Sequence, residues 1–466
     1  MNSAIFVIVV YLMILVGIGY YYSQKVSNMD DFAVAGRNIA WPILLASSAT
    51  SMIGGGASIG TVSKATTIGA GIGLAACAWY LSLVYSGMYI APKLRGLKFS
   101  TIGDFFAHKY GTFSRYWIGI VSFVFCMGIV AAQFAAIGNI FQSVLGINAT
   151  VGICIGLVVV VAYTSLGGMT SIMRVDVFQF LLLVCVFLGM CIYGLYQVGG
   201  YGPLLERLPQ DFTGWTGTWS VPKLISVFAA FFLGELLAPY FVQRMYSAKD
   251  EKNAKYGVTG AGLFMIFFLP ITMVTIGFIA YVEIPNVNGE TALVDLAGAL
   301  LPAPLVGLVA AAILACIISS CGAILSCCSI IATKDFYERL SKKQEITSAG
   351  LLKIGRGATL AISLIACFLA IQIPSVIDLL LYSYAMWAPA AVLPIALGVS
   401  RHYRSEKIYA VVASSIIGSL MSLTWLIMGQ PWEIDAGVAG FVVAVIVYFV
   451  VPAKHTESMP KILQPA

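Results

Sequence analysis

Long apolar runs separated by short polar connections make up most of the 466-residue chain. A run of about 20 apolar residues is the length that an α-helix needs to cross the hydrocarbon core of a bilayer. A scan with a window of that length predicts thirteen spans. They lie at residues 3–22, 39–63, 69–92, 114–140, 146–166, 171–197, 221–243, 256–283, 300–333, 352–372, 376–399, 407–428 and 434–452. The connections are short, so we expect no separate soluble domain.

Composition indicates the same class of protein. Hydrophobic residues make up 60% of the chain and charged residues 10%, with a mean hydropathy of +0.94, whereas charged residues are about 25% of a soluble domain. The chain is therefore expected to be an all-α integral membrane protein in a lipid bilayer. Its first span has no upstream basic cluster and no cleavage pattern, so we interpret it as a retained helix rather than a signal peptide.

The distribution of basic residues predicts the orientation. Of the 26 Lys and Arg residues, all but Lys64, Arg207 and Lys223 fall in the loops after odd-numbered spans or in the C-terminal tail. Since loops rich in Lys and Arg stay in the cytoplasm, the N-terminus is predicted outside and the C-terminus inside. The net charge of +6 thus reflects orientation in the plasma (inner) membrane, and no nucleic-acid partner is predicted.

The span at 39–63 carries a pattern that a simple anchor would lack. It holds several hydroxyl residues followed by Gly54, Gly55 and Gly56. Each glycine costs about 1 kcal/mol of helix propensity, so we predict a break near the middle of the span. Backbone carbonyls freed inside a membrane require a polar partner, and in transporters a coupling cation often supplies it. The alternative is that the small residues only allow close helix packing.

Three acidic residues lie within predicted spans, where each charge costs roughly 2.5–3.5 kcal/mol at a helix centre. Asp176 is a candidate for an ionic role, or alternatively a surface partner of Arg174. Glu235 precedes Pro239, which removes a backbone hydrogen bond and predicts a second interrupted span. The alternative for Glu235 is a protonated acid bonded to a neighbouring helix. Asp378 lies near the outer end of its span, where it can also be solvated.

The two interrupted spans, the second and the seventh, are five spans apart and cross the membrane in opposite directions. An inverted repeat of five plus five helices produces this relation and places a binding site between the breaks. On the ninth span, Cys316, Ser319 and Ser320 share one face with Ala323. Hydroxyl and carbonyl oxygens suit Na⁺ and suit Zn²⁺ poorly. Alternatively, each serine bonds the carbonyl four residues earlier.

These motifs resemble those of the sodium:solute symporter family, which has the LeuT-type fold. The resemblance rests on Ala49-Thr50-Ser51-Met52, on residues 163–169 continuing to Asp176 and Gln179, on residues 240–244, and on Ser319-Ser320 continuing to residues 333–337. It implies one transporter domain over 1–466, built on a 5+5 inverted repeat with broken first and sixth core helices. Its parts would be an accessory helix at 3–22, repeats at 39–197 and 221–400, and two C-terminal helices at 406–452.

The resemblance also implies a sodium site made by backbone carbonyls and serine hydroxyls. The positions that match are Ala49, Met52, Cys316, Ser319 and Ser320. Asp176 matches an acid that supports ion coupling. Members with two sodium ions have Ser where this chain has Cys316, so we expect one Na⁺ per substrate.

The sequence constrains the identity of the substrate less than it constrains the identity of the ion. Local motifs are nearest to the choline-transporter-like branch, but that branch has Trp where this chain has Ser51 or Met52 and Ala238, so its aromatic cage is missing. Candidates for lining or gating the substrate site are Ser51, Trp79, Tyr80, Glu235, Tyr240, Tyr384 and Trp387. The alternative for the aromatic residues is that they face lipid or fill the core.

The resemblance implies a sodium-coupled secondary active symporter that imports a small organic solute by alternating access, with a monomer as the functional unit. The alternative within the fold is a proton-coupled transporter or a transporter of a choline-like or amine-like cation. An enzyme is not predicted, because the three histidines lie in cytoplasmic segments and no HExxH or GxSxG pattern occurs. A channel would be expected to repeat a filter segment, and none is present.

Overall fold

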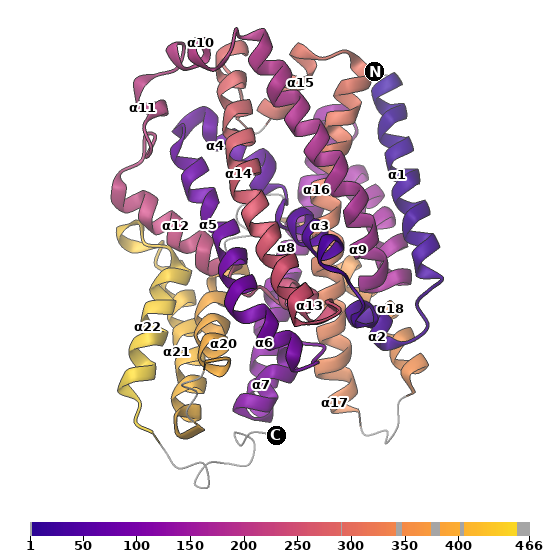
Figure 1. Cartoon of the computed structure of the whole chain (residues 1–466), viewed down its shortest axis with the longest axis vertical. Coiled ribbons are helices and arrows are strands. Elements are labelled where there is room, and N and C mark those ends of the chain that lie inside the picture. Colours follow the sequence, from indigo (N-terminus) through magenta and orange to yellow (C-terminus); the bar gives the residue numbers. More distant parts are fainter. Residues whose placement is uncertain (1, 290, 342–346, 374–382, 401–404, 454–466) are drawn as a thin grey trace.

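The computed structural model describes residues 2–289, 291–341, 347–373, 383–400 and 405–453 (Figure 1). All regular elements in these ranges are helical, and one isolated parallel bridge joins Ile39 to Ala248. The first helices are α1 (Asn2–Ser23), α2 (Met29–Val34), η1 (Ala35–Arg37), α3 (Trp41–Met52), η2 (Gly56–Gly60), α4 (Thr61–Ile68), α5 (Gly71–Tyr85), η3 (Ser86–Ile90), α6 (Ala91–Gly96), α7 (Ile102–Tyr110), α8 (Thr112–Leu145) and α9 (Ala149–Gln197).

The second half of the chain is likewise helical in the described ranges. Its elements are α10 (Tyr201–Glu206), α11 (Gln210–Thr213), α12 (Val221–Glu235), α13 (Pro239–Ser247), α14 (Glu251–Glu283), α15 (Ala292–Leu300), α16 (Ala303–Ile330), η4 (Ile331–Tyr337), α17 (Glu338–Leu340), α18 (Ser348–Gln372), η5 (Ala388–Val392), α20 (Leu393–Gly398), η6 (Ser405–Lys407), α21 (Ile408–Ile427), η7 (Pro431–Glu433) and α22 (Ala436–Val450).

The apolar helices account for the predicted spans. Eight helical runs in the described ranges are long and apolar enough to cross a membrane, and two bent pairs raise the number to ten. At a rise of about 1.5 Å per residue the 49 residues of α9 would extend about 74 Å, more than twice a hydrocarbon core of about 30 Å, so α9 is two spans joined at Gly168. With the shorter apolar helices Ser383–Gly398 and Ala436–Val450, these segments match the thirteen predicted spans.

Two details differ from the sequence prediction. Short helices, among them α7, α10, α11 and α15, occupy connections that the sequence predicts only as loops. The start of the predicted span 376–399, including Asp378, lies outside the described residues.

The bundle is packed around α16. Of the apolar window in α16, 94% is buried, compared with 28% in α1 near the N-terminus. Figure 1 shows α1 at one edge of the bundle and α22 at the opposite edge, with α16 between them. The described chain begins at the same end of the molecule as α10 and α15, whereas α7 and α17 lie at the other end. Because α16 is buried on all sides, polar groups on it contact protein rather than lipid.

Gly168 forms the junction within α9. Its backbone has φ +50° and ψ −147°, a conformation that essentially only glycine adopts. A Cβ atom at this position would lie 2.5 Å from the carbonyl oxygen of Phe32 in α2. The junction therefore requires glycine both for its conformation and for its close contact with α2.

We predict that Gly168→Ala destabilises the protein by about 1–3 kcal/mol, since the new side chain strains the backbone and collides with Phe32. Thermal unfolding of the detergent-purified protein would measure the loss. Gly189→Ala is the matched control, because a Cβ at Gly189 in the same helix meets no atom within 4 Å. Equal melting temperatures for the two variants would show that the junction is not strained by a side chain.

Candidate functional site

The predicted break in the span at 39–63 is confirmed. Helix α3 ends at Met52 and the chain resumes as a helix at Gly56, bent by 64°. The Ile53 amide donates to the Thr50 carbonyl at 3.1 Å instead of to the Ala49 carbonyl four residues earlier. The Ala49 carbonyl thus loses its helical partner, as expected for the last turn of a helix.

Gln133 of α8 bonds the interrupted backbone at this break. This role of Gln133 was not predicted from the sequence. Its Oε1 accepts a hydrogen bond from the Gly55 amide at 3.3 Å, and its side chain is buried. A Cβ at Gly54 would lie 2.9 Å from Gln133 Nε2. The glycines therefore allow a polar side chain to reach the interrupted backbone. A lone Gln inside an apolar span was the available signal.

The second predicted interruption is also confirmed. Helix α12 ends at Glu235, α13 begins at Pro239, and the two helices are bent by 47°. Pro239 occupies the first position of α13, where its missing N–H has no helical partner in any case. Leu237 between them has a φ of +61°. Proline thus starts a new half-helix here rather than kinking a continuous one.

Glu235 lies at this break with two tyrosine partners. The hydroxyl of Tyr240 donates to its Oε2 at 2.6 Å, and the hydroxyl of Tyr384 donates to its Oε1 at 2.8 Å. The side chain is 8% exposed, and no ion pair within the described ranges includes it. When only hydroxyl groups bond a carboxylate in an apolar bundle, no cation compensates its negative charge.

A cleft of about 550 Å³, part of it open to solvent, adjoins Glu235. Its lining includes Trp79, Phe231, Glu235, Tyr384, Ala388 and Asp435. The indole of Trp79 stacks on the ring of Phe231 with the ring centroids 4.0 Å apart. The cleft therefore has an aromatic wall and few polar groups in its lining.

The seven substrate candidates from the sequence divide into three groups. Trp79, Glu235 and Tyr384 line the cleft. Tyr240 contacts Glu235, and the indole N–H of Trp387 donates to the Leu236 carbonyl at 3.2 Å. Both residues therefore contact the second break without lining the cleft. The other two, Tyr80 and Ser51, are buried away from the cleft lining.

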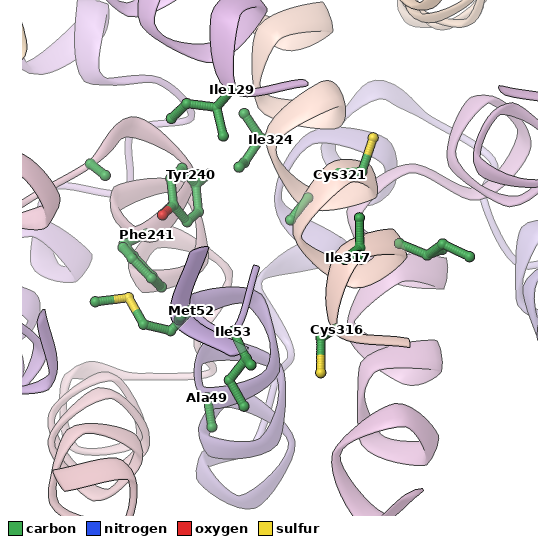
Figure 2. Packing of buried hydrophobic residues seen from close by; sticks show 14 of the residues in the cluster. Ala49, Met52, Ile53, Ile129, Tyr240, Phe241, Cys316, Ile317, Cys321 and Ile324 are labelled. Carbon is green, nitrogen blue, oxygen red and sulfur yellow. The ribbon is translucent and has the colours of Figure 1, made fainter. Parts of the chain in front are cut away.

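The candidate sodium ligands lie where α3 and α16 face each other. Ser320 Oγ lies 3.0 Å from the Ser51 carbonyl and 3.0 Å from the Cys316 carbonyl. The alternative interaction with the carbonyl four residues earlier therefore exists, but the same hydroxyl also reaches α3. Figure 2 shows the side chains of Ala49 on α3 and of Ile53 directly after it on the side that faces Cys316 of α16, with Met52 beside Phe241.

Asp176 joins this region from α9. Ser319 donates to its Oδ1 at 2.5 Å, and Ser47 donates to its Oδ2 at 2.5 Å. Its carboxylate also forms an ion pair with Arg244, 3.3 Å from Oδ2 to Nη2, and both side chains are almost fully buried. Asp176 thus contacts one of the candidate sodium ligands directly.

Two interpretations of the sequence are wrong here. Arg174 does not pair with Asp176, because its guanidinium lies over the ring of Tyr22 at 5.5 Å. Arg244 was placed in a cytoplasmic loop, yet it is 0% exposed within α13, because that helix continues to Ser247. The sequence signal that was missed is the pair Ser47 and Ser51, whose i, i+4 spacing presents two hydroxyls on one face of α3.

The comparisons with known proteins agree on the family and the fold. The chain matches the model of the sodium:solute symporter family over residues 32–418. The high-affinity proline transporter PutP of Bacillus subtilis is 27% identical over 459 residues, which cover 93% of this chain and 94% of that protein. Sodium/proline symporter 2 of Staphylococcus saprophyticus is 26% identical over 481 residues, covering 97% and 92%.

Two solved structures share the fold. A Na⁺-coupled sialic acid symporter in a substrate-bound, outward-open state has a TM-score of 0.84 at 20% identity, over 97% of this chain and 98% of that one. Mhp1, a nucleobase-cation-symport-1 family transporter, has a TM-score of 0.58 at 13% identity, over 89% and 92%. These neighbours have the LeuT-type fold that the sequence predicts.

The family match confirms the resemblance found in the sequence and does not favour the proton-coupled or choline-like alternative, since the relatives are sodium/proline symporters. Sodium is therefore the coupling ion, and the protein is a multi-pass membrane transporter rather than an enzyme. The chain belongs to the sodium:solute symporter family.

Proposed function

We propose that this symporter uses sodium to import a small organic solute by alternating access, and that the solute binds in the cleft beside Glu235. The observation that carries this proposal is the position of Glu235 at the break between α12 and α13, with Tyr240 and Tyr384 as its partners. A buried acid without a cationic partner favours a ligand that supplies a positive or hydrogen-bond-donating group.

The remaining lining favours a compact solute. Trp79 and Phe231 form a flat apolar wall, and Gly234, Ala385 and Ala388 leave room on the other sides. Proline combines a small apolar ring with an ammonium group, and the relatives from Bacillus and Staphylococcus are named as proline transporters. Proline is therefore the first solute to test.

For sodium we propose the backbone carbonyls of Ala49, Met52 and Cys316 together with the hydroxyls of Ser319 and Ser320. The termination of α3 at Met52 and the contact of Ser320 with the Cys316 carbonyl support this set. All of these groups are neutral oxygens, which suit a monovalent hard cation. Asp176 supports the site through its hydrogen bond with Ser319.

The contacts at the far ends of the broken helices support alternating access. The Ile39 amide donates to the Ser247 carbonyl at 3.1 Å, and the Lys249 amide donates to the Ile39 carbonyl at 2.8 Å. Arg95 of α6 donates to the carbonyls of Ala248 and Lys249. These contacts close the side where α3 begins and α13 ends, whereas the cleft beside Glu235 is partly open to solvent.

We place the closed side in the cytoplasm, with the N-terminus outside, because the basic residues fall on that side of the predicted topology. The protein would then sit in the plasma membrane with its solute cleft facing outward. We propose a monomer as the functional unit.

We predict that replacing Ser319 and Ser320 together with Ala raises the sodium concentration for half-maximal transport at least tenfold, because two hydroxyl ligands are lost. Solute uptake into proteoliposomes at varied sodium would measure it. Ser326→Ala is the control, since its hydroxyl is buried in the same helix and has no hydrogen-bond partner among the described residues. An unchanged sodium requirement in the double variant would contradict the proposed site.

We predict that Glu235→Gln weakens the apparent affinity for proline at least tenfold, about 1.4 kcal/mol, and leaves the sodium requirement nearly unchanged. The reason is the loss of the negative charge that faces the ammonium group. Counterflow of radiolabelled proline in proteoliposomes would give the affinity, and Glu283→Gln, in a surface pair with Arg207, is the control.

The same assay separates two roles of Glu235. A structural role would lower the melting temperature of Glu235→Gln and leave the proline affinity unchanged, which would remove Glu235 from the solute site. Absence of proline counterflow in the wild type would reject proline, and the measurement would then be repeated with a panel of sugars, carboxylates and other amino acids.

A further inference from the structure

Three basic side chains gather where α1 ends. Lys25 follows the last residues of α1, Arg174 lies in α9 shortly after the Gly168 junction, and Arg356 lies near the start of α18. We call these three residues the α1 basic patch. The helices that carry it pack on one another, since α9 contacts α1, α2 and α18. Figure 1 shows the end of α1 and helix α2 close to α18 at one edge of the bundle.

Two of the cations share one aromatic ring. Lys25 Nζ lies 5.0 Å from the ring centroid of Tyr22, and the guanidinium carbon of Arg174 lies 5.5 Å from the same centroid. The ring of Tyr21 stands edge-on to that of Tyr22 and lies 4.6 Å from Lys25 Nζ. The face of a ring attracts a cation but carries no net charge. Both positive charges are therefore held in place without being neutralised.

Arg356 reaches the same place through the backbone of α9. Its Nη2 donates to the Leu166 carbonyl at 3.0 Å. A Cβ at Gly167, the next residue, would lie 3.4 Å from Ser23 Cα at the end of α1. The Arg356 guanidinium thus bonds α9 beside the point where α9 contacts the end of α1, and this contact also carries the other two cations.

No acidic side chain in the described ranges forms an ion pair with any residue of the α1 basic patch. The two acids of the neighbouring helix α2 have other partners. Asp30 forms an ion pair with Arg37, and the Asp31 carboxylate accepts from the amide and the hydroxyl of Ser27 at 3.1 and 3.0 Å. Like charges gathered in this way repel one another, so an anion from outside the chain would stabilise them.

The position of the patch along α1 favours a lipid as the source of that anion. The apolar run of α1 ends at Tyr22, and tyrosine with basic residues at the end of a span is typical of the boundary between lipid and water. Only 28% of the apolar window of α1 is buried, and Met13, Tyr20 and Tyr21 on this helix are exposed. Acyl chains can cover this apolar surface while a phosphate group lies among the three cations.

We infer that the α1 basic patch is a binding site for the headgroup of an anionic phospholipid. Basic pockets between membrane helices on the cytoplasmic side recognise such headgroups, and each Lys or Arg near the surface adds attraction. Because its three residues come from the end of α1, from α9 and from α18, the bound lipid fastens the peripheral helix α1 to the bundle. The inference does not depend on the proposed solute cleft or on the proposed sodium site.

The test compares two lipids that differ only in headgroup charge. The purified, detergent-solubilised protein is titrated with phosphatidylglycerol or with phosphatidylcholine of the same acyl chains, and native mass spectrometry gives the affinity for the first bound lipid. We expect the wild type to bind phosphatidylglycerol at least tenfold more tightly. Lys25→Gln/Arg174→Gln should reduce this preference to threefold or less, because two of the three charges are lost.

A matched control separates a local site from overall charge. Lys252→Gln/Lys255→Gln removes two exposed lysines from the start of α14, outside the patch, and should keep the tenfold preference. Should Lys25→Gln/Arg174→Gln not accumulate, Lys25→Gln alone decides, since Lys25 is exposed and its loss leaves the packing intact. It should lower the preference at least twofold.

Three results would overturn the inference. The first is a wild type without preference for phosphatidylglycerol. The second is a preference that the patch variants keep, or that the control double variant loses to the same extent. The third is displacement of bound phosphatidylglycerol by millimolar glycerol 3-phosphate, which carries the phosphate without acyl chains and would show that the patch binds a soluble phosphate compound instead of a lipid.

Discussion

Satisfying polar groups in a medium without water is the constraint on which this structure depends. Two helices are interrupted inside the membrane, and each interruption exposes backbone groups that lipid cannot bond. The protein meets the demand with side chains from other helices. Gln133 reaches the first break, and the Trp387 indole reaches the Leu236 carbonyl at the second. The breaks persist because neighbouring spans bring donors and acceptors to them, and the same arrangement leaves oxygens available to a cation.

The sequence was sufficient for the membrane spans and for the two breaks, which depend on local chemistry. Three consecutive glycines and a proline predicted both breaks, and apolar run length predicted the spans, since both signals act over a few residues along the chain. The face of α16 that carries Ser319 and Ser320 followed from helical periodicity. The acidic residues within spans were noticed because charge is so costly there.

Contacts between distant segments could not be predicted in this way. Arg244 and Asp176 are 68 positions apart, and Glu235 and Tyr384 are 149 apart, so no local pattern pairs them. Arg244 was assigned to a cytoplasmic loop, because the positive-inside rule assigns a basic residue near the end of a span to the loop that follows. The rule describes average loop composition and does not recognise a cation that has its counter-charge inside the bundle.

The bridge between Ile39 and Ala248 has a further consequence. It joins the start of α3 to the end of α13 through main-chain hydrogen bonds only. The two half-helices are therefore tied together at these ends, since neither can leave the other without breaking both bonds. Because any residue except proline supplies the same amide and carbonyl groups, this mechanical link does not depend on side-chain identity. Substitutions in the proposed solute cleft and among the charges around it can therefore accumulate while this main-chain link stays the same.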